Sequence, residues 1–221
     1  MTGAHAAVAG HPIGHSLSPR LHAAAYEVLG ERIDYRALDL EEGELTGEVA
    51  LLRQDPQWRG LSVTMPLKSE AAELADELTD VARAVGTVNT LVPGPDGAVL
   101  GHNSDVSGIA AALRAAGPCP PAPRAAVLGG GGTATAALAA LQQLGAPRAD
   151  LWVRSASRAQ RAIDAADRLG LELRIRPWDE AAEHLAGYDL VVCTLPPHGA
   201  DELAAALAAV RGRRTGGTLL D

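Results

Sequence analysis

The sequence predicts an α/β fold in two domains, with a mainly parallel sheet in the first and a Rossmann-type arrangement in the second. Strand-like runs of apolar, often β-branched residues alternate with helix-like segments along the 221 residues. Gly117–Pro123 interrupts this alternation with four prolines and cannot be helical. After this stiff connector the alternation restarts with a strand, a run of four glycines and a helix. We therefore predict one domain over residues 1–106 and a second over residues 107–221.

The helices and strands of the first domain are predicted from the residues that typically begin or end such elements. Ala6–Gly10 is the first strand, and a helix is expected over Ser18–Leu29, with Ser18 as its N-cap, proline next and Gly30 as its stop. Pro93–Gly97 predicts a hairpin turn. Between these signals the pattern predicts strands over 33–40, 61–65, 87–92 and 98–100, and helices over 42–53, 69–78, 80–85 and 107–116.

The second domain repeats the alternation of strand and helix. The pattern predicts strands over 125–128, 151–154, 173–176 and 190–194, and helices ending near 144 and over 157–169, 179–185 and 201–210. Thr218–Asp221 begins one more strand. A parallel strand is normally covered on both faces, so we expect the natural protein to continue after it.

Composition narrows the range of partners. The net charge is −8, with 7 basic and 16 acidic residues in 1–106 against 12 and 11 in 107–221. An acidic chain is a poor candidate for nucleic acid binding, whereas the arginine-rich second half suits an anionic cofactor. No apolar run could span a bilayer and no signal peptide is evident, so no membrane partner is expected.

Cysteine usage indicates the compartment and argues against a metal. Cys119 and Cys193 are the only cysteines and lie far apart in the sequence. We expect both to be reduced thiols in a cytoplasmic protein. No Cys/His cluster has metal-ligand spacing, so no metal site is expected.

Lys68 is the only lysine in a chain with 18 arginines. Arginine keeps its charge, whereas a lysine can lose its proton when its surroundings lower its pKa. Lys68 follows a short β-branched run that breaks at Pro66, so it lies just past a predicted strand, where sites on α/β sheets tend to lie. It is therefore a candidate for proton transfer. The alternative is a solvated lysine in an arginine-biased composition.

Other polar residues of the first domain suit a small anionic ligand. Ser16 and Ser18 place two hydroxyls near a helix N-terminus, a suitable site for a carboxylate. Asn89 interrupts an apolar strand and needs partners, either backbone or ligand. Asp105 is either a first-turn helix acid or the carboxylate that pairs with Lys68. We interpret as loop and surface residues four histidines that form no triad or metal pattern: His11, His15, His22 and His102.

The glycine run has the spacing of a dinucleotide-binding turn. Gly129, Gly131 and Ala134 fit G-x-G-x-x-G/A between a predicted strand and helix. The first glycine permits the turn, the second lets the backbone approach a pyrophosphate, and the small third residue lets the helix pack closely. The helix N-terminus would then face the phosphates. The alternative is a glycine-rich surface turn.

The strand that follows favours NADP over NAD. An NAD site usually ends this strand with Asp or Glu, but here Arg154, Ser155 and Arg158 follow with no carboxylate. A 2′-phosphate suits guanidinium and hydroxyl donors. For Arg158 the alternative is a solvated residue in the first turn of the next helix.

Five segments together resemble the shikimate dehydrogenase family in order and spacing, over nearly all of the chain: 11–19, 62–68, 84–90, 101–105 and the glycine run. The resemblance implies reversible NADPH-dependent reduction of 3-dehydroshikimate to shikimate, in aromatic amino acid and chorismate biosynthesis. It implies Lys68 and Asp105 as the catalytic pair. The substrate would lie among Ser16, Ser18, Thr64, Lys68, Asn89 and Asp105. NADP would be held by Gly129, Gly130, Gly131, Gly132, Thr133, Ala134, Arg154, Ser155, Arg158 and Thr194.

The departures from the family pattern are limited. His102–Val106 stands where the family often has Asp-Asn-Thr-Asp-Gly, and Val153–Ser155 where it has Asn-Arg-Thr. Both keep the charge and hydroxyl types, so we expect tuning of the site. The family continues beyond Asp221 with a tyrosine-containing loop and a glutamine-bearing helix that contacts substrate and packs on the first domain. We expect the lack of that helix to expose apolar surface there and to favour self-association, including a homodimer.

Two other functions remain open at this point. One is a related dehydrogenase that acts on quinate or an aminoshikimate with the same residues. The other is a non-catalytic, NADP-binding regulatory protein, which would bind NADPH without turnover.

Overall fold

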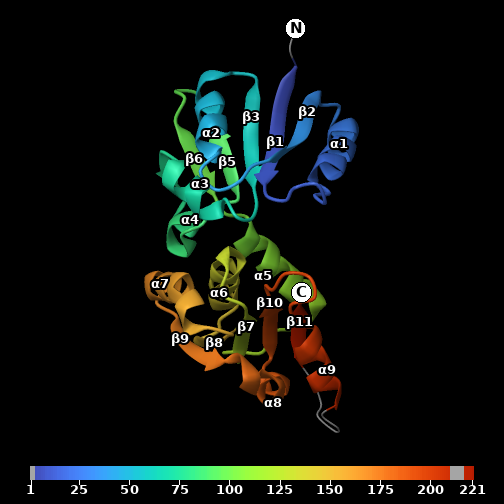
Figure 1. The fold of residues 1–221 in the computed structure, drawn as a ribbon, viewed down its shortest axis with the longest axis vertical. Coiled ribbons are helices and arrows are strands. Elements are labelled where there is room, and N and C mark those ends of the chain that lie inside the picture. Colours follow the sequence, from blue (N-terminus) through green and yellow to red (C-terminus); the bar gives the residue numbers. More distant parts are fainter. Residues whose placement is uncertain (1–2, 210–216) are drawn as a thin grey trace. The chain divides into compact units, whose positions relative to one another are not determined.

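The computed structural model describes residues 3–209 and 217–221 and divides into two compact units. The first unit ends at Ser104 and the second begins at Asp105 (Figure 1). Each unit has its own sheet and its own buried core. The α/β class and the mainly parallel first sheet are confirmed.

The first unit is built on a six-stranded sheet in the order β2-β1-β3-β5-β6-β4. Its strands are β1 (Ala4–Gly10), β2 (Ile33–Asp39), β3 (Trp58–Val63), β4 (Glu77–Leu78), β5 (Thr90–Pro93) and β6 (Val99–His102). β1 pairs in parallel with β2 and β3, and β4 with β6, while β5 is antiparallel to both neighbours. β5 and β6 form the predicted hairpin.

One face of this sheet carries the core. It packs against α2 (Leu45–Gln54) and α3 (Lys68–Leu74). Side chains alternate along a strand, so the strand residues that share this face are Ala7, Ala9, Leu61, Val63 and Leu91. Apart from Trp58, the core is therefore built from aliphatic side chains, in keeping with a sequence that has no Phe.

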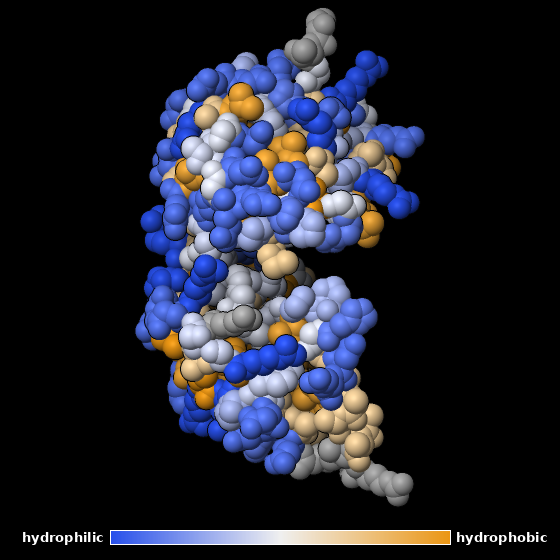
Figure 2. All heavy atoms as spheres, in the orientation of Figure 1, coloured by the Kyte–Doolittle hydropathy of each residue, from blue (hydrophilic) through white to orange (hydrophobic). Residues whose placement is uncertain are grey.

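The opposite face is covered more lightly. α1 (Ser18–Leu29) runs beside β2 and contains no buried residue (Figure 1). Leu21, Val28 and Leu29 of this helix are 66%, 87% and 70% exposed. Figure 2 shows apolar side chains at the surface over the region of α1, among hydrophilic ones. The position of α1 therefore depends on a small number of contacts.

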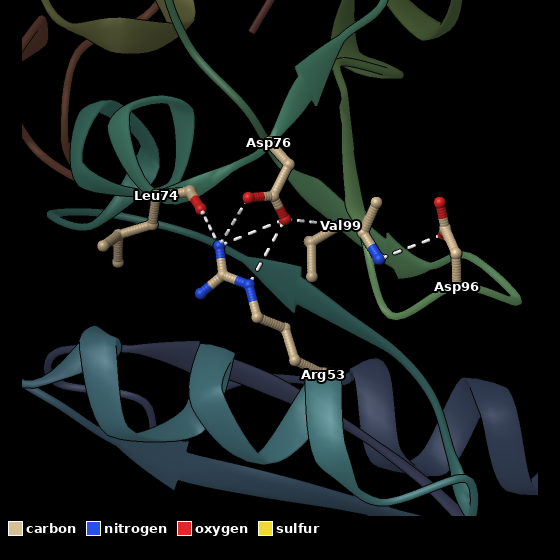
Figure 3. Close-up of polar contacts among 6 residues, drawn as sticks. Arg53, Leu74, Asp76, Asp96 and Val99 are labelled. Atoms are coloured by element: carbon tan, nitrogen blue, oxygen red, sulfur yellow. Dashed lines mark hydrogen bonds and ion pairs between the residues drawn. The ribbon is translucent and has the colours of Figure 1, made fainter.

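An ion pair fixes the far edge of the sheet. Arg53, in the last turn of α2, donates to both carboxylate oxygens of Asp76 at 3.1 to 3.2 Å and to the carbonyl of Leu74 at 2.8 Å (Figure 3). The N–H of Val99 donates to the same carboxylate at 2.8 Å. The bond from Val99, followed by that from Arg53, lowers the pKa of Asp76. This network ties α2 and the end of α3 to β6.

The second unit has a five-stranded, fully parallel sheet in the order β11-β10-β7-β8-β9. The strands are β7 (Ala125–Leu128), β8 (Arg148–Val153), β9 (Glu172–Pro177), β10 (Leu190–Cys193) and β11 (Thr218–Leu220). Counted from β7, this is the 3-2-1-4-5 order of a Rossmann-type sheet. The helices are α5 (Asp105–Ala116), α6 (Gly132–Gln143), α7 (Gln160–Leu169), α8 (Ala181–His184) and α9 (Asp201–Ala209).

Helices cover both faces of this sheet. α5, α6 and α7 contribute to the larger core, and α8 and α9 to a smaller one on the opposite face. Residues 134–141 of α6 are all buried. A helix that is apolar all round needs packing on all sides, and α6 has it from the sheet, α5 and α7. This burial holds the start of α6 firmly behind the glycine run.

Most predicted elements are confirmed in type, but α2 and α7 begin three residues after the predicted 42 and 157, and β3 and β8 begin three residues before the predicted 61 and 151. Four further details are wrong. The helix predicted over 69–78 ends at Leu74, because residues 77–78 pair with β6 as β4. The strand predicted from 87 begins at Thr90. The helix predicted over 179–185 is broken into α8 and two 3-10 turns, η2 (Trp178–Glu180) and η3 (Leu185–Gly187).

The fourth error concerns Ser18. The N-cap of α1 is Leu17, without a side-chain cap bond, and Ser18 is the first helical residue. Its N–H is instead satisfied by Ser16 Oγ at 3.3 Å. Ser16 Oγ therefore accepts a hydrogen bond from a backbone N–H at the start of α1, as a capping side chain does. The Ser18 hydroxyl is not the cap.

Candidate functional site

The candidate site lies at the carboxyl ends of β1 and β3, where side chains from several loops meet the sheet edge. Beyond β1, His11 N–H donates to the carbonyl of Met65 at 3.0 Å, and Thr64 N–H donates to that of Ala9 at 2.8 Å. A Cβ on Gly10 would overlap the Thr64 methyl group, so glycine allows this close approach. The loop after β1 and the loop after β3 therefore run against each other.

Ser16 and Ser18 belong to the first of these loops. Asp39, at the end of β2, anchors the loop by accepting from Ile13 N–H at 3.2 Å and by pairing with His11 at 3.0 Å. Ser16 N–H donates to the carbonyl of Ile13 at 2.9 Å. Both serine side chains are partly buried. The structure therefore holds two hydroxyls at the start of α1, as the sequence predicts.

Thr64, Lys68 and Asn89 are brought together by backbone hydrogen bonds. Val88 N–H donates to the carbonyl of Lys68 at 2.9 Å, and Val63 N–H donates to that of Asn89 at 2.8 Å. Lys68 is the first residue of α3, one turn after Thr64. All three side chains are partly buried. A hydroxyl, an ammonium and an amide thus lie on three segments that the backbone joins.

The amide of Asn89 is oriented by Ser104. Asn89 Nδ2 donates to Ser104 Oγ at 3.0 Å, and Ser104 N–H donates to Asn89 Oδ1 at 3.0 Å. Thr90 Oγ1 also donates to Oδ1, at 2.9 Å. Sequence reasoning expected neighbouring backbone or a ligand as partner and did not single out Ser104. The nearby Asn103 is buried and donates to Thr87 O and Oγ1, both at 3.0 Å.

Asp105 follows Ser104 directly and is the first residue of α5. It opens the second unit and is partly buried. Its predicted pairing with Lys68 stays a prediction.

Two histidines are not the plain surface residues that the sequence suggested. The ring of His22 stacks on Tyr35 with centroids 3.8 Å apart, and His102 Nδ1 lies 3.2 Å from Thr79 Oγ1. Neither contact has a sequence signal, because each joins segments more than ten residues apart. His11 and His15 are exposed loop residues, as expected.

The glycine run forms a tight turn between β7 and α6. Gly129 has a φ of +100°, and its N–H donates to the carbonyl of Trp152 on β8 at 3.0 Å. A Cβ there would lie 2.9 Å from Thr194 Oγ1, whereas a Cβ on Gly131 would meet nothing within 4 Å. Ala134 is fully buried. The three positions thus have the properties of a dinucleotide-binding turn: a bend, an open approach and close helix packing.

Thr194 closes the turn from the other side. It follows β10, and both its N–H and its hydroxyl donate to the carbonyl of Leu128 at 2.9 Å. β10 and β8 flank β7, so the strand order reverses at this point. Ligands of open α/β sheets bind in such a crevice at the carboxyl ends of the strands. Gly130, Gly132 and Thr133 complete this turn.

The residues predicted to select the cofactor lie after β8. Arg154 is exposed, donates to the carbonyl of Gly199 at 2.9 Å and lies 5.3 Å above the ring centroid of Trp178. Ser155 Oγ lies 2.8 Å from Ser157 Oγ. The side chain of Arg158 lies outside the described part of the structure. Trp178 and Gly199 were not singled out from the sequence, since neither belongs to a local motif.

Three further properties of the described residues concern metal ions, membranes and thiols. Its residues hold no group of three or more His, Cys, Asp or Glu that could bind a metal ion. None of its helices is both long and apolar enough to cross a membrane. Burial, and then a hydrogen bond with Asp221, raise the pKa of Cys193 to about 11. This thiol is therefore mostly protonated near pH 7.

The sequence matches the family model of the shikimate dehydrogenase substrate binding domain over residues 8–91. A curated shikimate dehydrogenase (NADP(+)) from Methylobacterium radiotolerans is 40% identical over 191 residues, which cover 85% of this chain. The chain spans 66% of that relative, just under two thirds of its length.

Two solved structures extend the likeness to both units. A shikimate 5-dehydrogenase from Mycobacterium fortuitum is 40% identical with a TM-score of 0.80, covering 94% of this chain and 76% of that one. Shikimate 5-dehydrogenase from Thermus thermophilus, in complex with NADP(H) and shikimate, is 36% identical with a TM-score of 0.72. That match covers 87% of this chain and 68% of the other.

Proposed function

Since this chain belongs to the shikimate dehydrogenase family, we propose that its protein reduces 3-dehydroshikimate to shikimate with NADPH, reversibly, in aromatic amino acid biosynthesis. The observation that carries the proposal is that backbone hydrogen bonds join Thr64, Lys68 and Asn89 at the sheet edge, all three within the matched residues 8–91. The names of the relatives support both the reaction and the cofactor.

The first domain, residues 1–106, would bind the substrate. Ser16 and Ser18 offer hydroxyl donors beside a helix N-terminus, an arrangement that suits a carboxylate. Thr64 and Asn89 would bind ring hydroxyls. Lys68 would contact both a hydroxyl and the reacting oxygen.

The second domain, residues 107–221, would bind NADP through the turn of Gly129 to Ala134 and Thr194. The open space at Gly131 and the bend at Gly129 fit a pyrophosphate. Arg154, Ser155 and Arg158 would select the 2′-phosphate. When bound, NADPH supplies the hydride.

Lys68 and Asp105 would handle the proton. As the carbonyl becomes an alcohol, its oxygen needs a proton, and an ammonium held against it can donate one. Asp105 would orient that ammonium and help restore its proton. Such general acid catalysis typically contributes about 10²- to 10⁴-fold to a rate.

The remaining proposals concern setting and assembly. The two cysteines are free, which supports a reducing, cytoplasmic compartment. The exposed apolar residues of α1 support self-association as a homodimer. Light scattering during gel filtration measures the molar mass and tests the dimer.

The test of function combines binding with turnover. Calorimetry measures shikimate and NADPH binding separately, and the absorbance of NADPH follows oxidation of shikimate by NADP⁺. Binding of both ligands with turnover supports the proposal. Faster oxidation of quinate or an aminoshikimate would reassign the substrate. NADPH binding without any shikimate binding would favour a regulatory protein.

A further inference from the structure

Two pairs of an arginine and a tryptophan lie at the β9 edge of the second sheet. In the first pair, Arg176 of β9 lies over the ring of Trp152, its register partner on β8, with the guanidinium carbon 5.4 Å from the ring centroid. In the second pair, Arg154 lies 5.3 Å from the ring centroid of Trp178. On each strand the residue of the second pair follows that of the first by two positions. Because side chains alternate along a strand, both pairs share one face of the sheet.

The first pair is fixed within the unit. Trp152 is fully buried, and Arg176 Nε lies 3.4 Å from Asp150 Oδ2. The Tyr188 hydroxyl donates to the same carboxylate oxygen. Burial, followed by this hydrogen bond, raises the pKa of Tyr188, so its hydroxyl keeps its proton and stays a donor. These contacts tie the side chains of β8 and β9 together directly before the second pair.

The second pair lies just past the carboxyl ends of the same two strands. Trp178 is half-buried and packs against the smaller core of this unit. Arg154 is exposed, and its Nη2 donates to the carbonyl of Gly199 at 2.9 Å. A guanidinium carries five N–H donors, so Gly199 leaves as many as four for a ligand. The ring below and the carbonyl beside it restrict the orientation of this guanidinium.

A strained turn holds that carbonyl in place. Gly199 N–H donates to the carbonyl of Pro196 at 2.8 Å, and a Cβ on Gly199 would lie 2.8 Å from the same oxygen. His198 has a φ of +64°, in the left-handed region that non-glycine residues seldom adopt. Its Nδ1 lies 3.0 Å from Asp201 Oδ2, at the first residue of α9. Strain of this kind persists only where the surrounding structure imposes it, and it is concentrated at binding sites.

We propose that Trp178 and the turn of residues 196–199 are positioning elements for Arg154, which hold its guanidinium ready for the 2′-phosphate of NADP. The inference rests on the proposed function and deepens it, because it makes the preference for NADP over NAD depend on how Arg154 is held. An arginine that is already oriented loses less side-chain freedom when it binds a phosphate. Trp178 and His198 act through Arg154.

A double-mutant cycle tests the link between Trp178 and Arg154. Calorimetry measures Kd of NADP⁺ and of NAD⁺ for the wild type, Trp178→Leu, Arg154→Ala and the double variant. The ratio of the Kd for NAD⁺ to that for NADP⁺ isolates the 2′-phosphate. Trp178→Leu should lower this ratio about two- to fivefold, as for an exposed cation–π pair, and Arg154→Ala about tenfold or more. The double variant should have the ratio of Arg154→Ala, because Trp178 acts through that arginine.

Two results of this cycle would overturn the inference. One is a Trp178→Leu variant that binds both cofactors more weakly by the same factor, since the ring would then act on a part that they share. The other is a double variant in which the two losses of preference multiply.

The turn is tested by a pair of matched glycine substitutions. His198→Gly accepts the same backbone conformation without strain and frees the turn from Asp201. Ala122→Gly makes the same kind of change at a φ of +50° in the connector of residues 117–123. His198→Gly should lower the ratio about twofold or more with no loss of thermal stability, and Ala122→Gly should leave the ratio unchanged. An unchanged ratio in His198→Gly, or an equal fall in both variants, would overturn the role of the turn.

The outcomes separate this inference from the proposed reaction. The ratios come from binding alone, so a wild type that fails to oxidise shikimate would overturn the reaction while the ratios still decide the inference. A wild type that oxidises shikimate but binds NAD⁺ and NADP⁺ equally well would overturn the inference and leave the reaction standing.

Discussion

Two alanine substitutions in the glycine turn should separate its folding from its ligand binding. Gly129 has a φ of +100°, and a Cβ there would lie 2.9 Å from Thr194 Oγ1 and 3.1 Å from Leu195 Cδ2. Backbone strain of this kind costs about 1–3 kcal/mol. Thr194 must also move and disturb its bond to Leu128. Gly129→Ala should therefore lower the free energy of unfolding of the second unit by at least that amount.

Gly131→Ala is the matched change without strain. Gly131 has a φ of −79° and a ψ of −173°, and a Cβ there meets nothing within 4 Å. The entropy removed from the unfolded chain stabilises by about 0.4–1 kcal/mol, and alanine at an N-cap costs a similar amount. The free energy of unfolding should stay within about 1 kcal/mol of wild type. The methyl group would meet the pyrophosphate, so NADPH affinity should fall at least about tenfold, or ~1.4 kcal/mol.

Urea unfolding followed by circular dichroism measures the first effect, and titration of NADPH fluorescence measures the second. If Gly131→Ala bound NADPH with wild-type affinity, the turn would not hold a pyrophosphate. If Gly129→Ala were as stable as Gly131→Ala, the strain argument would be refuted.

Three further predictions concern single side chains. Lys68→Arg should keep shikimate affinity in calorimetry but lose about 10²-fold or more in turnover, and near-normal turnover would refute proton transfer by Lys68. Arg154→Ala should reduce the preference for NADP⁺ over NAD⁺ in affinity titrations, and Trp178→Leu, which removes the ring beneath the guanidinium, should reduce it less. An unchanged preference in Arg154→Ala would place the 2′-phosphate elsewhere. The bond from Val99 lowers the pKa of Asp76 below its ordinary 3.8, so this carboxylate stabilises the fold above that pH and the gain is lost as the pH falls through the lowered value. The difference in thermal stability between wild type and Asp76→Asn should therefore shrink below about pH 4, and a difference independent of pH would contradict this.

Local signals explain which elements could be predicted from the sequence. α4 (Asp80–Val85) was predicted with its observed bounds, because Thr79 accepts from Ala82 N–H at its start and Gly86, with a φ of +70°, ends it. The glycine turn was predictable for a similar reason, because Gly129 has a φ of +100° that favours glycine and the position of Gly131 is open. In contrast, β4 owes its existence to pairing with β6. A two-residue strand has no periodicity to detect, so the helix before it, α3, was predicted to extend too far.

The unpredicted parts of the candidate site depend on strand register. Asn89 meets Ser104 only because β5 and β6 fold back on each other, which sets Thr90 opposite His102. Beside the site, the Tyr35 hydroxyl donates to Ser62 Oγ at 2.8 Å only because β1 lies between β2 and β3 in a particular register. The partners lie 15 residues apart in the first pair and 27 in the second, and no local sequence pattern indicates contacts over such separations. Such contacts can be found only once the sheet order is known.

The backbone, more than the side chains, builds the proposed substrate site. Val63 and Val88 attach Asn89 and Lys68 through main-chain carbonyls, and Thr64 is attached through its own N–H. These bonds survive any side-chain substitution that keeps the backbone conformation. Loss of turnover in a variant at Lys68 is therefore interpretable as lost chemistry. The same inference would fail at the buried Asn103, because its side chain supplies the hydrogen bonds that hold Thr87 in place.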